Sequence, residues 1–127
     1  MLITINTQDR RPIYQQIADG IRTLIASGQI AEGQSLPPVR QLAADLGVNL
    51  NTVAAAYRDL QDEGLIVVRH GARAVVASRD GARPADGEIR RPLRSVLARM
   101  VLSKMPRTEI LNVVTDELDA LLHGSGS

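Results

Sequence analysis

The chain has 127 residues, a formal net charge of +1, no cysteine, two histidines and only two aromatic residues, Tyr14 and Tyr57. This length allows one compact domain with a small appendage, and the lack of cysteine excludes disulfides and thiolate metal sites. Because single-stranded nucleic acids are usually held by stacking on aromatic rings, the composition favours duplex over single strands. The sequence contains neither a secretion signal nor an apolar run of membrane length, so we expect a soluble cytoplasmic protein.

The first third of the chain predicts a short strand followed by a helix. Residues 2–5 (LITI) form a β-type run that suits an edge strand. Pro12 suits the first turn of a helix, where its missing N–H group has no cost. The helix is expected to end near Ser27 and Gly28. Its apolar residues recur at helical spacing and are Ile13, Ile17, Ile21, Leu24 and Ile25.

The middle of the chain predicts two short helices in tandem. The apolar pattern favours a helix over 39–46 and another over 50–63. Gly47 suits the left-handed position that ends many helices, and Asn49 is a favourable N-cap for the helix that follows. Two β-type runs come next, over 65–69 and 74–77. Helix, tight turn, helix and hairpin is the order of a winged helix-turn-helix, which places its second helix in the major groove of DNA.

The residues of the predicted recognition helix divide into two faces. The inward face is expected to contain Val53, Tyr57 and Leu60, and the outward face Leu50, Asn51, Ala54, Ala55 and Arg58. Small residues at 54–56 either allow close approach to another surface or simply favour the helix.

A polar segment with scattered glycine and proline, 79–92, predicts a linker between a winged domain (1–78) and a tail (93–123). The last residues, 124–127 (Gly-Ser-Gly-Ser), are expected to be either a frayed end or an appended tag remnant, outside the fold in both cases. The fold class is therefore mainly α with a small β-wing (α+β).

The tail predicts two amphipathic helices that are separated by Pro106. Their apolar residues are Leu93, Val96, Leu97, Met100, Val101, Ile110, Leu111, Val114, Leu118, Leu121 and Leu122. Forty residues are too few to bury two such faces alone. We expect a dimerisation hairpin, and the alternative is that the hairpin folds back on the first helix.

Short polar side chains stand where a recognition helix meets base edges. Asn51 suits adenine, and Thr52 suits a hydrogen bond or a thymine methyl group. Asn49 either contacts DNA or only caps the helix. Leu50 would contact a thymine methyl group in a groove and otherwise packs locally.

Basic residues surround this helix. Arg40 starts the preceding helix and is a candidate for phosphate or a guanine edge, unless it forms a surface ion pair with Asp45. Arg58 is a candidate phosphate contact. The predicted wing tip contains Arg69, His70, Gly71 and Arg73, which suit a narrow minor groove or form an ordinary solvated hairpin.

No group of residues in the sequence has the spacing of a catalytic triad, a phosphate-binding loop or a metal site. Adjacent carboxylates such as Asp62 with Glu63 lie on predicted exposed helix faces. We therefore expect no enzymatic activity, no metal and no cofactor.

The motifs from Pro12 to Val76 resemble the DNA-binding domain of GntR-type bacterial transcription regulators. They include PIYQQI, GQSLPPVRQLAADLGVN, NLNTVAAAYRDLQDEGLI and RHG. The NxNTV and AYRxL forms, with two tail helices, are similar to the short YtrA-type subfamily. The resemblance implies homodimers that commonly act as repressors. It also implies DNA contacts by Arg40, Asn49, Asn51, Thr52, Arg58, His70 and Gly71.

The chain departs from the family pattern at several positions. Leu50 and Ala54 stand where many members have arginine, so the operator sequence cannot be copied from them. Arg73 replaces a second wing glycine, and Val75 replaces an aromatic residue. Pro38 stands where serine is commoner.

These observations predict a sequence-specific regulator of transcription, a homodimeric repressor on a palindromic DNA operator. The alternative is a winged-helix adaptor that binds another protein through its third helix. The polar residues of that helix argue against the adaptor, because protein interfaces favour aromatic anchors. A small-molecule effector of unknown identity would bind between the winged domain and the tail, or at the dimer seam. No membrane partner is expected.

Overall fold

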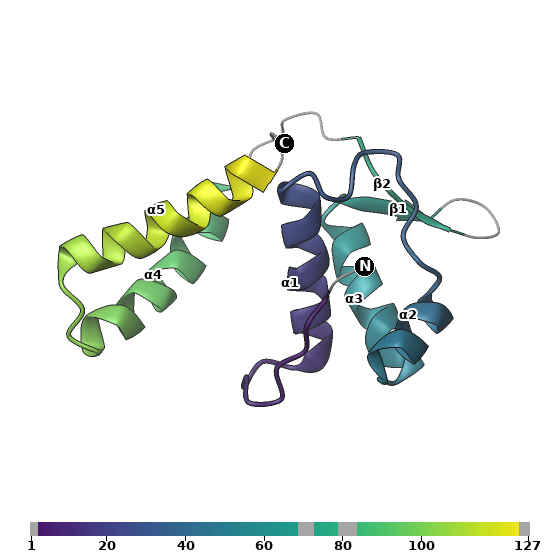
Figure 1. Cartoon of the computed structure of the whole chain (residues 1–127), viewed down its shortest axis with the longest axis horizontal. Helices are drawn as coiled ribbons and strands as arrows, with labels where there is room; N and C mark the ends of the chain where they lie inside the picture. Colours follow the sequence, from purple (N-terminus) through teal and green to yellow (C-terminus); the bar gives the residue numbers. More distant parts are fainter. Residues whose placement is uncertain (1–2, 69–72, 79–83, 125–127) are drawn as a thin grey trace.

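The computed structural model describes residues 3–68, 73–78 and 84–124. The elements are α1 (Ile13–Ala26), α2 (Val39–Leu46), α3 (Leu50–Asp62), β1 (Ile66–Val68), β2 (Ala74–Val76), α4 (Asp86–Leu102) and α5 (Arg107–Gly124). The first three helices and the two strands form one body, and α4 and α5 lie antiparallel beside it (Figure 1). This arrangement confirms the predicted fold class, a mainly α protein with a small β-wing.

The core of the winged domain is closed between α1, α2, α3 and the hairpin. α1 and α2 both pack on α3, and β1 also contacts α3. The apolar residues at helical spacing face this centre, which explains why three short helices are stable together. The fully buried large side chains are Ile17, Ile21, Ile25, Leu36, Leu42, Val53, Leu60, Ile66 and Val76.

The turns between helices follow from local sequence as predicted. Gly47 ends α2 in the left-handed conformation, with φ of 70°, which has no steric cost for glycine. Asn49 then caps α3, because its side chain accepts a hydrogen bond from the N–H group of Asn51 at 2.7 Å.

The wing contains a third extended segment that we did not predict. β1 and β2 are antiparallel, with Ile66 opposite Val76 and Val68 opposite Ala74. The segment 33–36 pairs with the other edge of β2. The N–H group of Leu36 donates to the carbonyl of Ala74 at 2.8 Å, and Gln34 accepts from Val76 at 2.9 Å. The loop before α2 is therefore held by the wing.

The strand predicted for residues 2–5 is wrong for the part that the structure describes, because residues 3–5 belong to no strand there. A side chain holds this segment instead. The buried Gln16 accepts from the N–H group of Asn6 at 2.8 Å and donates to its carbonyl at 3.1 Å. Ile3 packs against α1 beside Gly20, where a Cβ atom would lie 3.1 Å from its Cγ2.

The tail also differs from the prediction at its start. α4 begins at Asp86, so residues 86–92, which we assigned to the linker, are helical and Pro92 lies inside the helix. Two features favour this early start. Asp86 and Glu88 place negative charge in the first turn, and Arg90 pairs with Asp86 at 2.9 Å. The backbone around Pro92 is exposed, so water can bond the carbonyl that proline leaves without a donor.

None of the helices in the described part of the chain is long and apolar enough to span a membrane.

Candidate nucleic-acid interface

The N-terminal half of α3 presents polar side chains to solvent. Asn51 is exposed, Thr52 is half-buried, and Leu50 is 40% exposed. Asn49 is also exposed, and its side-chain oxygen Oδ1 already accepts the capping hydrogen bond from the N–H group of Asn51. The structure therefore supports the capping role of Asn49, and it leaves the side chains of Asn51 and Thr52 available for base edges.

The charge distribution along α3 distinguishes its two ends. The first turns contain no acidic residue, whereas Asp59, Asp62 and the adjacent Glu63 lie at the far end. Glu63 is occupied by α1, because Arg22 donates to it twice, with Nη2–Oε1 of 2.6 Å and Nε–Oε2 of 3.0 Å. A phosphate backbone would be repelled by this far end, so duplex DNA would meet the N-terminal half.

A buried tyrosine sets the position of α2 relative to α3. The hydroxyl group of Tyr57 donates to the carbonyl of Pro37 at 2.6 Å, just before α2 begins. Burial raises the pKa of Tyr57 to about 12. This contact joins the recognition helix to the entry of α2 and so determines where Arg40 projects. Sequence reasoning placed Tyr57 in the core but missed this role.

The two predicted phosphate contacts, Arg40 and Arg58, are exposed. Within the described part of the chain, neither forms an ion pair, and the alternative pairing of Arg40 with Asp45 does not occur. Both guanidinium groups therefore remain available for phosphate. Arg69, His70 and Gly71 lie outside the described residues.

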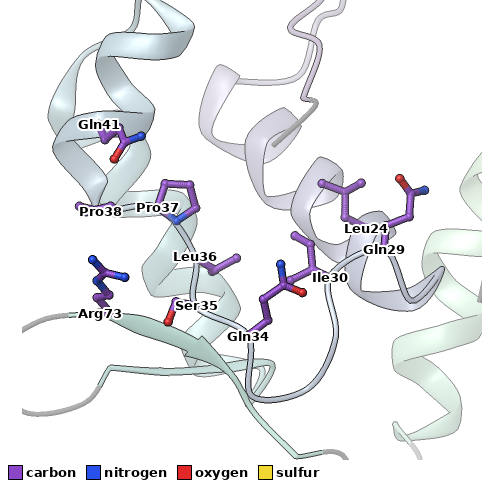
Figure 2. Close-up of a pocket in the computed structure, with 10 residues that line it drawn as sticks. All are labelled: Leu24, Gln29, Ile30, Gln34, Ser35, Leu36, Pro37, Pro38, Gln41 and Arg73. Carbon is purple, nitrogen blue, oxygen red and sulfur yellow. The ribbon is translucent and has the colours of Figure 1, made fainter.

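A crevice of about 560 Å³ separates the base of the wing from the entry of α2 (Figure 2). Arg73 lies at one wall, below Pro38, and Gln41 lies at the start of α2. Ser35 and Gln34 line the bottom, where the third extended segment follows β2. We did not predict Gln41 as part of this interface. Its position directly after Arg40 in the sequence is the signal from which it could have been found.

The predicted dimerisation residues lie on an uncovered face of the tail. α4 contains no buried residue, and Leu118 on α5 is 51% exposed. An apolar groove of about 490 Å³ runs between the two helices. It is lined by Leu93, Leu97, Val101, Met105, Arg107, Ile110, Leu111 and Val114. The alternative, in which the hairpin buries these residues against α1, is therefore not the arrangement of this structure.

No group of three or more metal-ligating His, Cys, Asp or Glu side chains occurs among the residues that the structure describes.

Comparisons with known proteins agree with this geometry. The family model described as "Bacterial regulatory proteins, gntR family" matches residues 13–76. The chain is 39% identical over 70 residues to the HTH-type transcriptional repressor YtrA of Bacillus subtilis. The matched segment covers 55% of this chain and 54% of that relative, so the similarity spans about half the length of the relative.

Similar folds occur among solved structures. YtrA from Sulfolobus acidocaldarius, a GntR-family transcription factor, has a TM-score of 0.62 and 42% identity, over 80% of this chain and 99% of that one. A transcriptional antiterminator from Listeria monocytogenes has a TM-score of 0.86 and 26% identity, over 96% and 93%. AraR(DBD) in complex with operator ORE1 has a TM-score of 0.52 and 27% identity, over 61% and 94%. These proteins are named as factors that act in transcription or bind an operator, and none of the three is named as an enzyme. This agrees with the prediction from sequence that the chain has no enzymatic activity.

Proposed function

Because the chain belongs to the gntR family of bacterial regulatory proteins, we propose that it is a homodimeric repressor that binds a palindromic operator. It is a DNA-binding transcription regulator of YtrA-like type. We propose three further properties of this regulator: that it forms a dimer, that its operator is symmetric, and that it represses transcription. Bacterial DNA lies in the cytoplasm, so the protein would act there.

One observation carries the proposed DNA contact: the N-terminal half of α3 is polar, exposed and free of acidic residues, and it is held rigidly. Asn49 caps it and Tyr57 joins it to the entry of α2. In the major groove, Asn51 would pair with adenine and Thr52 would contact a neighbouring base. Arg40 and Arg58 would bind phosphates on either side. An adaptor surface would need aromatic anchors, and this face contains none.

The uncovered tail face supports the proposed homodimer. The apolar groove between α4 and α5 would be filled by the same hairpin of a second copy, because a two-fold interface uses one self-complementary surface. Such a dimer presents two recognition helices. The half-sites of the operator would then be inverted repeats, with centres about 34 Å apart.

Repression would follow from occupancy alone. A dimer that lies on the operator excludes other proteins from the same DNA, and the similar protein of Bacillus subtilis is named a repressor. Release of repression would require only a change in the spacing of the two recognition helices.

The first experiment compares Asn51→Ala with Gln61→Ala. Both changes remove an exposed amide from α3, but Gln61 lies at the acidic far end. Binding is measured on DNA selected from a random duplex pool and on a scrambled duplex, across a salt series. Asn51→Ala should lose about 1–3 kcal/mol of operator affinity and keep its affinity for scrambled DNA. Gln61→Ala should match the original protein.

Two results would contradict the proposal. Equal affinities of both variants for the selected DNA would exclude base contact by Asn51. Selected sequences without inverted repeats would exclude the palindromic operator.

A further inference from the structure

A second polar crevice lies away from α3, where the winged domain meets the tail. Its volume is about 640 Å³. The loop before α1 forms one side with Asn6, Gln8, Asp9, Arg10 and Arg11, and α4 contributes Arg99 to the other side. Three arginines and one aspartate thus face the same space. The proposed DNA contacts of α3 do not use any of these residues.

The charges in this crevice are only partly compensated. Arg11 is occupied, because its Nη2 lies 2.8 Å from Oδ2 of Asp9 and its Nη1 contacts Asp19. The hydrogen bonds from Arg11 hold the pKa of Asp9 below its usual value, and the positive charge of Arg99 adds to this effect. Arg10 and Arg99 have no acidic partner of their own within the described part of the chain.

We propose that this crevice binds a phosphate group between Arg10 and Arg99. The guanidinium groups of Arg10 and Arg99 line the same crevice, where an anion between them would offset their mutual repulsion, and arginine donors match phosphate oxygens in pairs. The exposed amide side chain of Gln8 provides a further donor at the rim. The inference goes beyond the proposed function, because it assigns a second anion site outside the recognition helix.

A simpler explanation accounts for part of this arrangement. Arg99 lies in the last turn of α4, where a positive charge interacts favourably with the helix end. That effect would favour arginine at this position in any helix. It does not explain why the same side chain lines one crevice with Arg10 and Arg11.

The proposed site lies between two parts of the molecule. Arg10 belongs to the winged domain and Arg99 to the tail, so a bound phosphate would join the two parts. A phosphate group at this point has two sources, a small phosphorylated molecule or the DNA backbone beside the operator. A small molecule would alter the orientation of α3 relative to the tail, whereas DNA would add an electrostatic contact.

The first arm of the test uses inorganic phosphate with the full chain. Phosphate is titrated at constant ionic strength against chloride, and arginine Nε–H resonances are followed by NMR. Arg10→Gln and Arg99→Gln should each weaken phosphate binding about tenfold, the loss of one charge-assisted contact. Arg94→Gln is the matched control, because it removes the same charge from an exposed position of α4 outside the crevice. Circular dichroism verifies that each variant is folded.

The second arm measures operator affinity against salt concentration. If the phosphate belongs to DNA, Arg99→Gln should lower the slope of log affinity against log salt by about 0.9, and Arg94→Gln should not. Saturable phosphate binding with an unchanged DNA slope identifies the small-molecule source.

The site is wrong if Arg99→Gln and Arg94→Gln behave alike in both arms. That result would leave the proposed repressor intact, provided that the original chain still selects its operator. Conversely, phosphate binding without any operator selection would contradict the repressor and support the site.

Discussion

The winged domain and the tail hairpin have similar apolar patterns but differ in how far their apolar side chains are buried. In the winged domain the periodic residues are buried, and Ile17, Ile21, Val53 and Leu60 have no exposed surface. In the tail the equivalent residues remain half exposed, and α4 has no buried residue. Periodicity therefore predicts a helix and the direction of its apolar face, but it does not predict what covers that face.

Geometry explains the difference. Three helices and the hairpin pack around a common centre (Figure 1). Two antiparallel helices have no third layer, so the residues along their groove lose only part of their contact with water. The apolar groove that remains open between α4 and α5 is therefore the feature that supports the proposed homodimer.

The largest expected effect concerns the proposed dimer. Leu97→Glu or Leu118→Glu places a charge on the uncovered face, and burial of that charge would prevent association. Sedimentation should show a monomer. Operator affinity should fall by about 10²–10⁴-fold, because the two winged domains would no longer be joined when they bind the two half-sites. Asn112→Glu adds the same charge to the polar face of α5 and should remain dimeric. A dimer that survives both leucine changes would disprove the assignment of the interface to the tail.

The second prediction compares the loss of one apolar side chain in each region. Both changes are made in the Leu97→Glu chain, so that stability is measured on a monomer. Ile21→Ala should lower the free energy of unfolding by about 2–5 kcal/mol, because it leaves a cavity in a closed core. Val101→Ala, at a residue that is 60% exposed, should change it by less than about 0.5 kcal/mol. Chemical denaturation followed by circular dichroism measures both, and equal effects would mean that the tail has a core of its own.

The smallest effect concerns Tyr57, inside the winged domain. Tyr57→Phe should cost about 1 kcal/mol, because the carbonyl of Pro37 loses its donor. Burial raises the pKa of Tyr57 from 10.0 to about 12. Folding therefore favours the neutral phenol. The resulting stabilisation is complete below pH 10 and is lost as the pH rises towards about 12.

The measurement is unfolding by urea at pH 8, 10 and 11. The original chain should lose stability between the last two, and Tyr57→Phe should lose less. Tyr14→Phe is the control, since the hydroxyl group of Tyr14 accepts one long bond, of 3.4 Å from Gln15, among the residues that the structure describes. Identical pH profiles for Tyr57→Phe and the original chain would show that folding does not shift the pKa of this phenol.

Local signals predicted most of the winged domain. α2 begins and ends at the predicted residues, and α3 ends within one residue of its predicted limit. Gly47 and Asn49 act as predicted because turns and caps depend on a few adjacent residues. The third extended segment of the wing escaped prediction, because residues 33–36 meet β2 only after the chain has folded. Gln16 escaped for the same reason, since its partner Asn6 is ten residues away.

The candidate interface was predictable as a set of residue types but not as a surface. The polar residues of α3 stood out because a helix with an apolar inner face must expose its other side. The crevice between Arg73 and Gln41 depends on how the wing packs against α2, and sequence alone does not determine that contact. The same holds for Arg10 and Arg99, which are 89 positions apart in the chain and line one space.

The sequence by itself determined the helices, the left-handed turn before α3, the polar face of that helix and the family resemblance. These features depend on spacing and on neighbouring residues, which are present in the linear order. Tertiary structure alone decided which apolar faces are covered, where the entry of α2 is held by Tyr57, and which arginines share a crevice. Such properties depend on contacts between distant segments, and the free energy of each contact exists only when the rest of the fold has brought its partners together.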